Sequence, residues 1–584
     1  LRTLINQGLE HVRNTASLSD QNFDILVIGG GITGACAALD AVQRGLSVAL
    51  VEQGDFAGAT SAQSLKMIHG GIRYLQHLDL VRLRESCRER MTFLRNAPHL
   101  TRPLPIVVPT FGHGMQGKFV FRVALFLNHI LTIDRNKGIG DRERQIPAGH
   151  IMSRKQVMDD YPYVETKSLT GAACFYDGQI LDAPRLIWSI VRSAIEMGAV
   201  ACNYCDVRNL VSENGRVVGA RIADVVSGET VSVRAKAVVN ATGPFAQSFV
   251  GSSSSATPKN VPLSRDMAFV VKRSISEKTA IGVQTKFKDP DALLSRGNRH
   301  LFLAPWRGYT LVGVDSRVFP EDPYSLDVTE EEIATFIEEV NEAIPTLNLK
   351  RDDIGVVYGG LLPFGENAEN STDLSFGKRS LMIDHGDGDD GLLGLFSAMS
   401  VRWTMGRQTA ERVIDAAQKY LHGSSTECNT HRTAVFGGDF ESLEILKEEV
   451  KKDDVGRELE PAIRNHLVQT YGTDWRGPLE LVRHDSSLMR RVSPDPIIGA
   501  EIAYAIKSEM AVSLADCVLR RTDIGTGEMP TDDTLAACAD IAADVLGWDS
   551  SKVNAEIESV KACYPFFGKV NGASKTVGEE DYDA

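Results

Sequence analysis

Three glycines with the spacing GxGxxG, Gly29, Gly31 and Gly34, stand near the start of the chain. An apolar run, FDILVIGG (23–30), precedes them, a helical pattern of small and apolar residues follows, and Glu52 closes the next apolar run. In such a unit the glycines let the backbone approach a pyrophosphate at the helix N-terminus, and the acid accepts hydrogen bonds from a ribose. The alternative is a tight strand-to-helix turn, but an acid at this distance favours a dinucleotide-binding βαβ unit.

The stretch SAQSLKMIHGGIRYL (61–75) is a second place where polar side chains could do chemistry. His69 and Arg73 lie four residues apart, and two glycines stand between them. A neutral imidazole takes or gives a proton near physiological pH. A guanidinium can donate two hydrogen bonds at once to a phosphate, sulfonate or carboxylate. The stretch raises the question of which anion Arg73 binds; the alternative is that it pairs with a carboxylate of the protein itself.

Both stretches resemble the N-terminal part of FAD-dependent glycerol-3-phosphate dehydrogenases and oxidases, which belong to the flavoprotein superfamily built like D-amino-acid oxidase. The strand AVVNATGPFA (237–246) resembles the second cofactor-contacting strand of that superfamily. Further similar segments are ESCRERMTFLRNAPHLTRPLPIVVP (85–109), YDGQILDAPRL (176–186), LFLAPWRGYTLVGV (301–314) and RTDIGTGEMP (521–530). The resemblance covers most of the chain and implies that the cofactor is FAD.

The resemblance also implies roles for individual residues. In the family, the segment SxxSxKLIHGGLRY wraps the flavin and its arginine reaches the substrate's phosphate, so Arg73 is expected to clamp the anion and His69 to act as the base. The alternative for His69 is a hydrogen bond to flavin or backbone, with another group taking the proton. The implied FAD contacts are Gly29, Gly31, Gly34, Glu52, Thr60, Ser61, Ser64, Lys66, His69, Gly70, Gly71, Ala241, Thr242 and Gly243; the implied substrate contacts are Arg73, Tyr74, Arg402 and Arg407.

Three departures from the family pattern fall on the substrate side. Leu362 stands where a Gly-x-Arg-Pro segment usually supplies a second phosphate-binding arginine. In SVRWTMGR (400–407), Arg402 replaces a lysine while Arg407 is retained. The strand SRDMAFVVKR (264–273) lacks the small residues often seen before it. Either Arg402 compensates for the missing arginine, or Leu362 marks a pocket for a larger or less charged substrate.

The elements that must position these residues follow from the periodicity of the apolar residues. A helix is predicted at 184–199, and strands are predicted at 215–224 and 229–243. Further strand signals, with one acidic helix (328–344), occur within 262–365 and indicate a second sheet. Helical patterns dominate 440–566. The predicted fold class is α/β, a Rossmann-like FAD-binding domain with an inserted antiparallel-sheet substrate domain and a C-terminal helical domain. The expected parts are an N-terminal helix or leader (1–22), the FAD-binding domain (23–110, 176–261 and 366–421), a substrate-side insertion with an apolar helix (111–175), the substrate domain (262–365), a linker (422–433), the helical domain (434–566) and a mobile tail (567–584).

Composition bounds the class of protein and its compartment. The chain of 584 residues is 43% hydrophobic and 24% charged, which is typical of a globular protein. A net charge of −14 argues against a nucleic-acid-binding surface, and nine scattered cysteines indicate a reducing compartment. The N-terminus has no secretory signal pattern, although a removed leader before Leu1 stays an alternative. No metal site is expected, because DHGDGDDG (384–391) lacks the distal glutamate of a calcium loop.

The apolar run FVFRVALFLNHILTI (119–133) is shorter than the ~20 residues of a membrane span. It predicts either a helix packed in the protein interior or an amphipathic helix lying on a membrane surface. A cytoplasmic protein is expected, with peripheral attachment to the inner face of a membrane as the alternative. The acidic chain would oppose anionic lipid unless a local basic face exists.

Together, these features predict oxidation of the secondary alcohol of a small polyol phosphate, with hydride passing to FAD and electrons going on to quinone or oxygen. This activity would belong to glycerol metabolism. One alternative is an FAD-dependent oxidoreductase of a different anionic hydroxy or amino compound. The other is a non-catalytic flavin-binding scaffold, which the retention of buried cationic side chains such as Arg407 disfavours.

Overall fold

The computed structural model describes residues 13–77, 79–112, 117–253, 261–288, 298–363, 380–386 and 391–567. The side chains of Arg73, Gln76, His77, Ser253, residues 286–288 and residues 298–300 are outside this description. Most of the predicted leader (1–22) and tail (567–584), and Asp387, Asp389 and Asp390 of the acidic turn, likewise lie outside the described residues.

One sheet is built around parallel strands that carry the glycine motif. Its order is β16-β17-β10-β1-β2-β7, and β8 and β9 extend it beside β10. The apolar runs of the sequence form its centre because parallel strands are covered on both faces. Its strands are β1 (Asn22–Ile28), β2 (Val48–Val51), β7 (Val200–Cys202), β8 (Cys205–Glu213), β9 (Arg216–Asp224), β10 (Thr230–Asn240), β16 (Leu381–Asp384) and β17 (Leu395–Met399).

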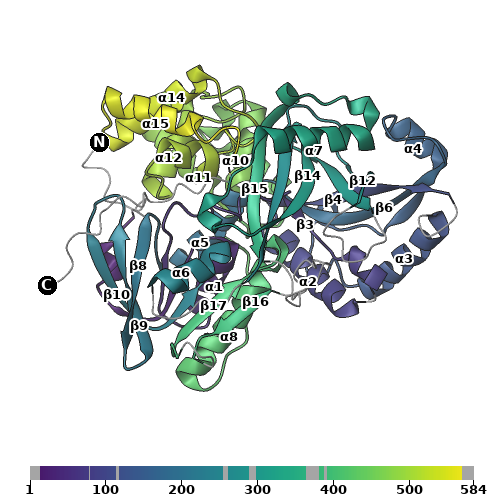
Figure 1. Cartoon of the computed structure of the whole chain (residues 1–584). Helices are drawn as coiled ribbons and strands as arrows, with labels where there is room; N and C mark the ends of the chain where they lie inside the picture. Colours follow the sequence, from purple (N-terminus) through teal and green to yellow (C-terminus); the bar gives the residue numbers. More distant parts are fainter. Residues whose placement is uncertain are drawn as a thin grey trace.

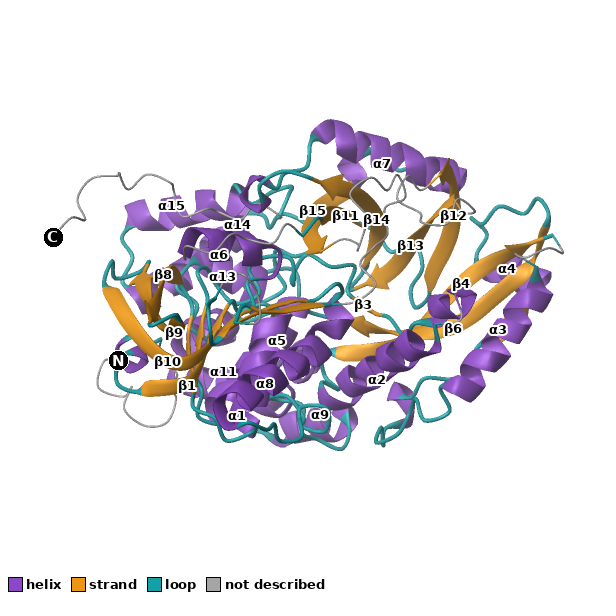
Figure 2. Ribbon diagram, turned by 60° about the horizontal axis from the view of Figure 1, so that its bottom comes forward, coloured by secondary structure: helices purple, strands orange, loops and turns teal. Residues whose placement is uncertain are grey.

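Three helices cover one face of this sheet and form the largest apolar core with it. They are α1 (Ile32–Gln43), α5 (Ala183–Glu196) and α8 (Gly406–His422), and Figure 2 shows them side by side next to β1 and β10. The helices α1 and α5 stand where the sequence predicted them and are buried along almost their whole length, whereas the buried positions of α8 repeat at helical spacing. Small residues in α1 let it approach the strands closely, which places its N-terminus at the edge of the sheet.

The second sheet is mainly antiparallel and forms the other half of the molecule (Figure 1). Its order is β15-β11-β14-β13-β12-β4-β6-β3, with β5 beside β6, and β12 pairs with β4 in parallel. Its strands are β3 (Met67–Ile68), β4 (Thr101–Phe111), β5 (His150–Ser153), β6 (Leu169–Ile180), β11 (Leu263–Val271), β12 (Ala280–Lys288), β13 (Asn298–Trp306), β14 (Tyr309–Phe319) and β15 (Ile354–Pro363). The acidic helix α7 (Glu330–Ala343) packs its apolar face on this sheet, as predicted.

The boundary between the two halves differs from the predicted one. Residues 23–110 were assigned to the cofactor domain, but β3 and β4 within that range pair with β6 of the second sheet. Strand propensity indicates that a segment is extended, whereas its membership of a sheet depends on a partner strand that lies 58 to 112 residues away in the sequence. The antiparallel substrate sheet is therefore assembled from the N-terminal third of the chain as well as from 262–365.

Helices of the substrate half and the C-terminal part complete the fold. Beside the second sheet lie α2 (Leu80–Asn96), α3 (Lys118–Leu131) and α4 (Arg154–Asp160), and α6 (Ala246–Ser253) follows β10. The predicted helical domain has its own core and consists of α9 (Leu443–Lys452), α10 (Pro461–Tyr471), α11 (Arg476–His484), α12 (Gly499–Ser508), α13 (Leu514–Asp516), a π-helical turn (Cys517–Arg521), α14 (Asp532–Leu546) and α15 (Ser550–Lys561). Figure 1 shows it, in yellow-green, against both halves.

Candidate active site

A cavity of about 2480 Å³ opens where the carboxyl ends of β1, β10 and β17 face the second sheet. Residues of both halves line it, including Gly29 and Glu52 from the first sheet and Ile106, Phe175 and Phe302 from the second. Ligands of open parallel sheets bind outside the carboxyl ends of the strands. The two sheets thus place a cofactor-sized space at the edge that the glycine motif predicted.

The glycine motif makes a turn that no larger residues would fit. Gly29 has φ +106°, and a Cβ on Gly34 would lie 1.8 Å from the Gly29 carbonyl oxygen. Gly31 is the N-cap of α1, so the helix begins directly at the cavity. Free N–H groups at this helix end and its dipole suit a pyrophosphate. The observed close packing is what the spacing of the three glycines predicted.

The acid after β2 lies beside the same helix end. Glu52 lines the cavity, and its carboxylate accepts hydrogen bonds from the amides of Gly30 at 2.6 Å and Gly54 at 2.9 Å. Burial raises the pKa of Glu52, although these two amides oppose the rise. Each carboxylate oxygen keeps a further lone pair that can accept from a ribose hydroxyl. The helix end and the carboxylate therefore fit the ADP half of FAD.

The third predicted cofactor element follows β10. The Ala241 amide donates to the Ile28 carbonyl at 2.8 Å, which holds the two strand ends together. Gly243 has φ +63°, and Ala241, Thr242 and Gly243 all line the cavity. The Ala-Thr-Gly segment thus forms the wall opposite Glu52's strand, on the far side of β1.

The segment from residue 60 to 66 crosses from the first sheet to the second. Ser61 Oγ accepts from the Ile32 amide at 3.0 Å at the start of α1, and Thr60 Oγ1 donates to the Leu361 carbonyl at 3.3 Å. Thr60, Ser61 and Ser64 line the cavity. These contacts explain how a loop can follow a bound cofactor from the pyrophosphate end toward the substrate half.

Lys66 belongs to the same segment but does not line the cavity. Its buried ammonium lies 4.0 Å from the Tyr358 ring centre and 5.0 Å from that of Trp306, and it donates to the Ala62 carbonyl at 3.2 Å. Burial lowers the pKa of Lys66 to about 7, with Arg307 adding to this and Asp182 opposing it. Lys66 therefore holds the segment from behind, and a direct contact with the cofactor stays a prediction.

His69 faces the cavity and is fixed by a buried acid. Its Nδ1 lies 3.3 Å from an Asp177 oxygen, and its side chain is 43% exposed. The other Asp177 oxygen accepts from the Gly70 amide at 2.7 Å and from Arg90 at 2.9 Å. Burial alone would raise the pKa of Asp177, but His69, Arg90 and the Gly70 amide together hold it below the usual value. The anionic carboxylate favours the tautomer with hydrogen on Nδ1, which leaves Nε2 as a proton acceptor.

Asp177 and Arg90 are residues that sequence reasoning missed. Asp177 stood within YDGQILDAPRL, one of the segments similar to the family, but nothing local marked its carboxylate as a partner of His69, 108 residues away. The buried Arg90 in turn leaves no room for a side chain at Gly70, because a Cβ there would lie 1.9 Å from an Arg90 nitrogen. Gly70 is therefore required by the close approach of this buried pair, whereas Gly71 has φ +82° and faces Tyr74 and Ser86 instead.

A cation and a phenol lie on the same wall as His69. The Thr404 hydroxyl oxygen accepts from the His69 amide at 3.3 Å, and the Arg402 guanidinium carbon lies 5.0 Å from the Tyr74 ring centre. Tyr74, His69 and Arg402 all line the cavity. The backbone of Arg73 lies in the 3₁₀ helix Ile72–His77, but its side chain is outside the described residues, so its anion-binding role stays a prediction.

Leu362 also lines the cavity, from strand β15. It is half-buried and pairs in the sheet with Ser264. The position of the missing arginine therefore faces the cavity, and an apolar side chain occupies it.

Arg407 does not take part in this site. Its buried guanidinium donates to both oxygens of Glu89, at 2.7 and 2.6 Å, and to Glu411 at 2.9 Å and Thr430 at 3.0 Å. It ties α8 to α2 and is absent from the described cavity lining. The predicted substrate contact is thus not supported by the geometry. Because Glu89 compensates its charge, Arg407 also gives no argument against a non-catalytic scaffold.

Comparison with known proteins agrees with this arrangement. Residues 24–400 match the family described as FAD dependent oxidoreductase, and residues 428–553 match the C-terminal domain of alpha-glycerophosphate oxidase. The chain is 30% identical over 560 residues to a glycerol-3-phosphate dehydrogenase of Synechocystis, covering 94% of this chain and 97% of that protein. It is 30% identical over 568 residues to the human mitochondrial glycerol-3-phosphate dehydrogenase, covering 92% and 72%.

The fold is shared with a solved structure as well. The glycerol-3-phosphate dehydrogenase from Bacillus halodurans complexed with FAD superimposes with a TM-score of 0.70 at 24% identity, covering 94% of this chain and 95% of that one. The chain is a member of the FAD-dependent glycerol-3-phosphate dehydrogenase family.

Proposed function

We propose that this enzyme oxidises the secondary alcohol of sn-glycerol 3-phosphate, or of a closely similar polyol phosphate, to the ketone. The observation that carries the proposal is the wall on which His69, Tyr74 and Arg402 line one cavity together. It offers a proton acceptor and a cation to a substrate that carries both a hydroxyl and an anion. The cofactor end of the same cavity fits FAD.

The residues divide the reaction between proton transfer and positioning. Asp177 keeps the imidazole of His69 oriented, so that Nε2 can accept the hydroxyl proton as the C–O double bond forms. When bound, FAD supplies the acceptor for the hydride that leaves the carbinol carbon. Because Asp177 is anionic and buried, it also stabilises the imidazolium that results.

Arg402 is the described cation best placed to bind the phosphate. It lines the cavity beside Tyr74, and a guanidinium can donate two charge-assisted hydrogen bonds to phosphate. The apolar Leu362 on the same cavity favours a second possibility, an anionic hydroxy or amino compound with a larger apolar part. The two substrates differ in whether the anion is a phosphate.

The final electron acceptor is proposed to be a membrane quinone rather than oxygen. Residues of α3, among them Val123, Leu127 and Ile130, line the apolar end of the cavity. Their helix also exposes apolar side chains, with Phe119 76% and Phe126 62% exposed. An apolar passage that ends at an apolar outer surface suits a lipid-soluble acceptor.

Helix α3 supports peripheral attachment to a membrane. It contains Lys118 and Arg122 but no acidic residue, so it is locally basic in a chain of net charge −14. Leu125 is its one fully buried position among the residues described, which rules out the predicted interior helix. None of the helices in the described ranges has the length and apolarity needed to cross a bilayer. A helix of this kind lies in the plane of the lipid headgroups.

The test is anaerobic mixing of the purified holoenzyme with sn-glycerol 3-phosphate while the visible flavin absorbance is recorded. Rapid bleaching is expected, and glycerol without phosphate should bleach the flavin far more slowly. Arg402→Met should raise the substrate concentration for half-maximal bleaching by roughly 30-fold, since losing charge-assisted hydrogen bonds costs about 2 kcal/mol. The matched control is Arg412→Met, an arginine on α8 paired with Glu85 at the surface.

Other outcomes distinguish the alternatives. Bleaching by another anionic alcohol or amine, but not by sn-glycerol 3-phosphate, would assign the substrate specificity to the pocket around Leu362. A flavin that no anionic alcohol or amine reduces would contradict the enzyme proposal and favour the scaffold.

A further inference from the structure

The segment 52–61 contains three of the predicted cofactor contacts, Glu52, Thr60 and Ser61, and all three line the cavity. The segment has no regular secondary structure after β2. Within the part of the chain that the structure describes, no residue beyond Thr404 lines the cavity, so the helical domain does not reach it. If the helical domain shapes this segment, it must do so through residues that lie behind the cavity wall.

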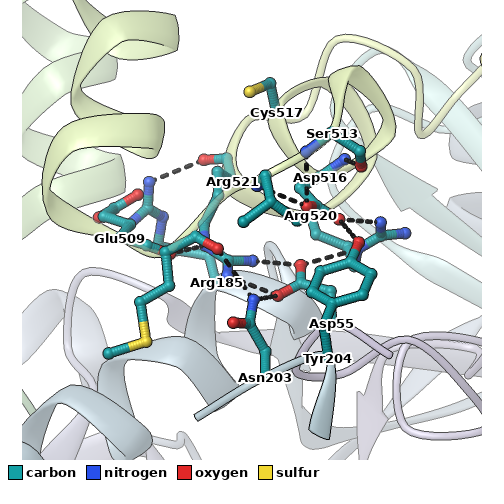
Figure 3. A network of polar contacts seen from close by, with 12 residues as sticks. Asp55, Arg185, Asn203, Tyr204, Glu509, Ser513, Asp516, Cys517, Arg520 and Arg521 are labelled. Carbon is teal, nitrogen blue, oxygen red and sulfur yellow. Dashed lines mark hydrogen bonds and ion pairs between the residues drawn. The ribbon is translucent and has the colours of Figure 1, made fainter. Parts of the chain in front are cut away.

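Asp55, within the segment, forms ion pairs with two arginines of the helical domain. Arg521 donates to both Asp55 oxygens at 2.7 Å, and Arg520 donates to one of them at 2.8 Å (Figure 3). Asp55 is buried and does not line the cavity. The two arginines are adjacent in a π-helical turn, a rare local geometry that often occurs at functional sites.

The surrounding groups compensate the charges and make the contact specific. Asp516 accepts from Arg520, and Glu509 accepts from Arg185, whose guanidinium also donates to the Arg521 carbonyl at 2.7 Å. With Asp55 and Arg521, the cluster has three acids and three arginines. The Arg521 guanidinium also lies 4.7 Å from the Trp188 ring centre, and Trp188 packs on Phe56. A buried network of this kind has little freedom to rearrange.

A second tie runs through the turn between β7 and β8. The Asn203 amide donates to Asp55 at 2.9 Å and to the Met510 carbonyl at 2.9 Å. The Tyr204 amide donates to the Gly54 carbonyl at 2.7 Å, and its hydroxyl donates to Asp516 at 2.7 Å. Figure 3 shows both side chains beneath the arginines. The Asp55 side chain and the backbone just before it are thereby linked to the helical domain through this turn.

We propose that the helical domain is a positioning element of the cofactor site, and that Arg520 and Arg521 act through Asp55 to hold the segment 52–61 in its FAD-binding shape. Arg520, Arg521 and Asp55 are positioning residues, since none of them lines the cavity. Glu52 precedes Asp55 by three residues and Ser61 follows it by six, so a shift of the anchor moves both ends of the ADP site.

The coupling must act in both directions. If docking of the π-helical turn on Asp55 raises the affinity for FAD, bound FAD stabilises that docking by the same factor. Loss of FAD is therefore expected to loosen the turn although it lies outside the cavity. The preference for Asp55 to be paired is strong, because a buried carboxylate left without its arginine is severely destabilising.

The test compares FAD dissociation constants of Asp55→Asn, Arg521→Gln and the double variant, measured by reconstituting apoprotein and following the quenching of FAD fluorescence. Each single change is expected to raise the dissociation constant at least tenfold. The FAD dissociation constant of the double variant should not exceed that of the single variant with the higher dissociation constant, since the two side chains act as one unit. The Michaelis constant for sn-glycerol 3-phosphate at saturating FAD should change less than threefold.

A matched control breaks an ion pair of the same type elsewhere. Arg265 donates to both oxygens of Glu332 at 3.0 and 2.6 Å in the substrate half. Arg265→Gln should leave the FAD dissociation constant within twofold of the wild type. Unchanged FAD affinity in folded Asp55→Asn and Arg521→Gln would overturn the proposal, as would an equal loss in Arg265→Gln.

A measurement on the wild-type chain avoids variants that fail to fold. Amide hydrogen exchange of residues 514–526 should be at least fivefold slower with FAD bound than in the apoprotein, while that of α9 stays the same. Equal exchange of residues 514–526 with and without FAD would contradict the coupling directly.

Discussion

At the scale of single residues, the proposed proton acceptor is defined by what lies behind it. His69 has one nitrogen committed to Asp177 and faces the cavity with the rest of its ring. Its position between a cavity and a buried carboxylate is the arrangement of a general base. The His69 amide donates to Thr404 and the Gly70 amide donates to Asp177, so the backbone that carries the ring is fixed.

His69→Gln should slow the reduction of the flavin by substrate at least about 100-fold, because a general base typically contributes 10²- to 10⁴-fold. The bound flavin spectrum should be retained. Stopped-flow absorbance under anaerobic conditions measures the rate, and His150→Gln, an exposed histidine on β5, is the control. A loss of less than threefold would assign proton removal to another group or to water.

Lys66 is a buried amine whose charged form is destabilised by burial more than it is stabilised by the neighbouring Asp182. Its pKa is lowered from 10.5 to about 7, first by burial and then by the charge of Arg307. Between pH 7 and 10.5, the unfolded chain therefore holds a proton on this group that the folded chain does not. Stability must rise with pH across that window, by an amount on the order of a few kcal/mol.

Lys66→Met tests this linkage, because methionine keeps most of the volume and removes the titration. The difference in melting temperature, wild type minus Lys66→Met, should increase from pH 7 to pH 9 and be constant below pH 6. Differential scanning fluorimetry measures it, with the exposed Lys350→Met as control. A difference that is independent of pH would show that the amine in the folded protein titrates near its ordinary pKa.

At the scale of elements, α3 is amphipathic in an unusual way. Phe119 and Ile130 line the cavity and are also more than half exposed, and Phe126 is more than half exposed without lining the cavity. Figure 2 shows the helix at the edge of the substrate half, beside β6 and away from the helices α1, α5 and α8 that cover the first sheet. Large exposed apolar patches mark interaction surfaces.

The double change Phe119→Ser with Phe126→Ser should reduce cosedimentation with vesicles that contain anionic lipid at least tenfold, since two large apolar side chains are lost. Flavin reduction by substrate should be unaffected. The double change Val225→Ser with Val226→Ser removes two exposed apolar side chains of a distant turn and is the control. Equal binding of all three proteins would remove α3 as the membrane contact.

At the scale of the whole molecule, the cofactor joins parts that come from distant regions of the chain. Its predicted contacts lie after β1, after β2, in the segment 60–71 and after β10, and the substrate end adds residue 402. A ligand that bridges these parts stabilises only the folded state. The two sheets are then held by the ligand as well as by their own contacts.

Removal of FAD should lower the melting temperature by several degrees, and added FAD should restore it. ADP alone is expected to restore part of the loss, because it carries the pyrophosphate and ribose that fit the end of α1 and Glu52. Thermal melts of apoprotein with and without each ligand measure this. Full recovery with FAD but none with ADP would place the binding energy at the flavin end instead.

The sequence by itself determined the parts of the protein that local chemistry dictates. The GxGxxG spacing and the acid at Glu52 predicted one end of the cavity, because a turn without side chains must contain glycine wherever it occurs, and the Ala-Thr-Gly segment was expected there from the family resemblance. Periodicity predicted α1, α5, α7, the helical domain and the two-sheet architecture, because apolar side chains repeat along a helix or a strand with the period of that element.

Only the tertiary structure decided which charged side chains reach the cavity and which hold the fold. Arg402 and Arg407 stand in the same short segment, and the same role was predicted for both from the sequence. In the structure, Arg407 is buried against Glu89, whereas Arg402 lines the cavity. Asp177 behind His69 and Asp55 beneath Arg521 depend on contacts across 108 and 466 residues. A local pattern cannot encode them, because an ionic group's role depends on the charge that the folded chain places beside it.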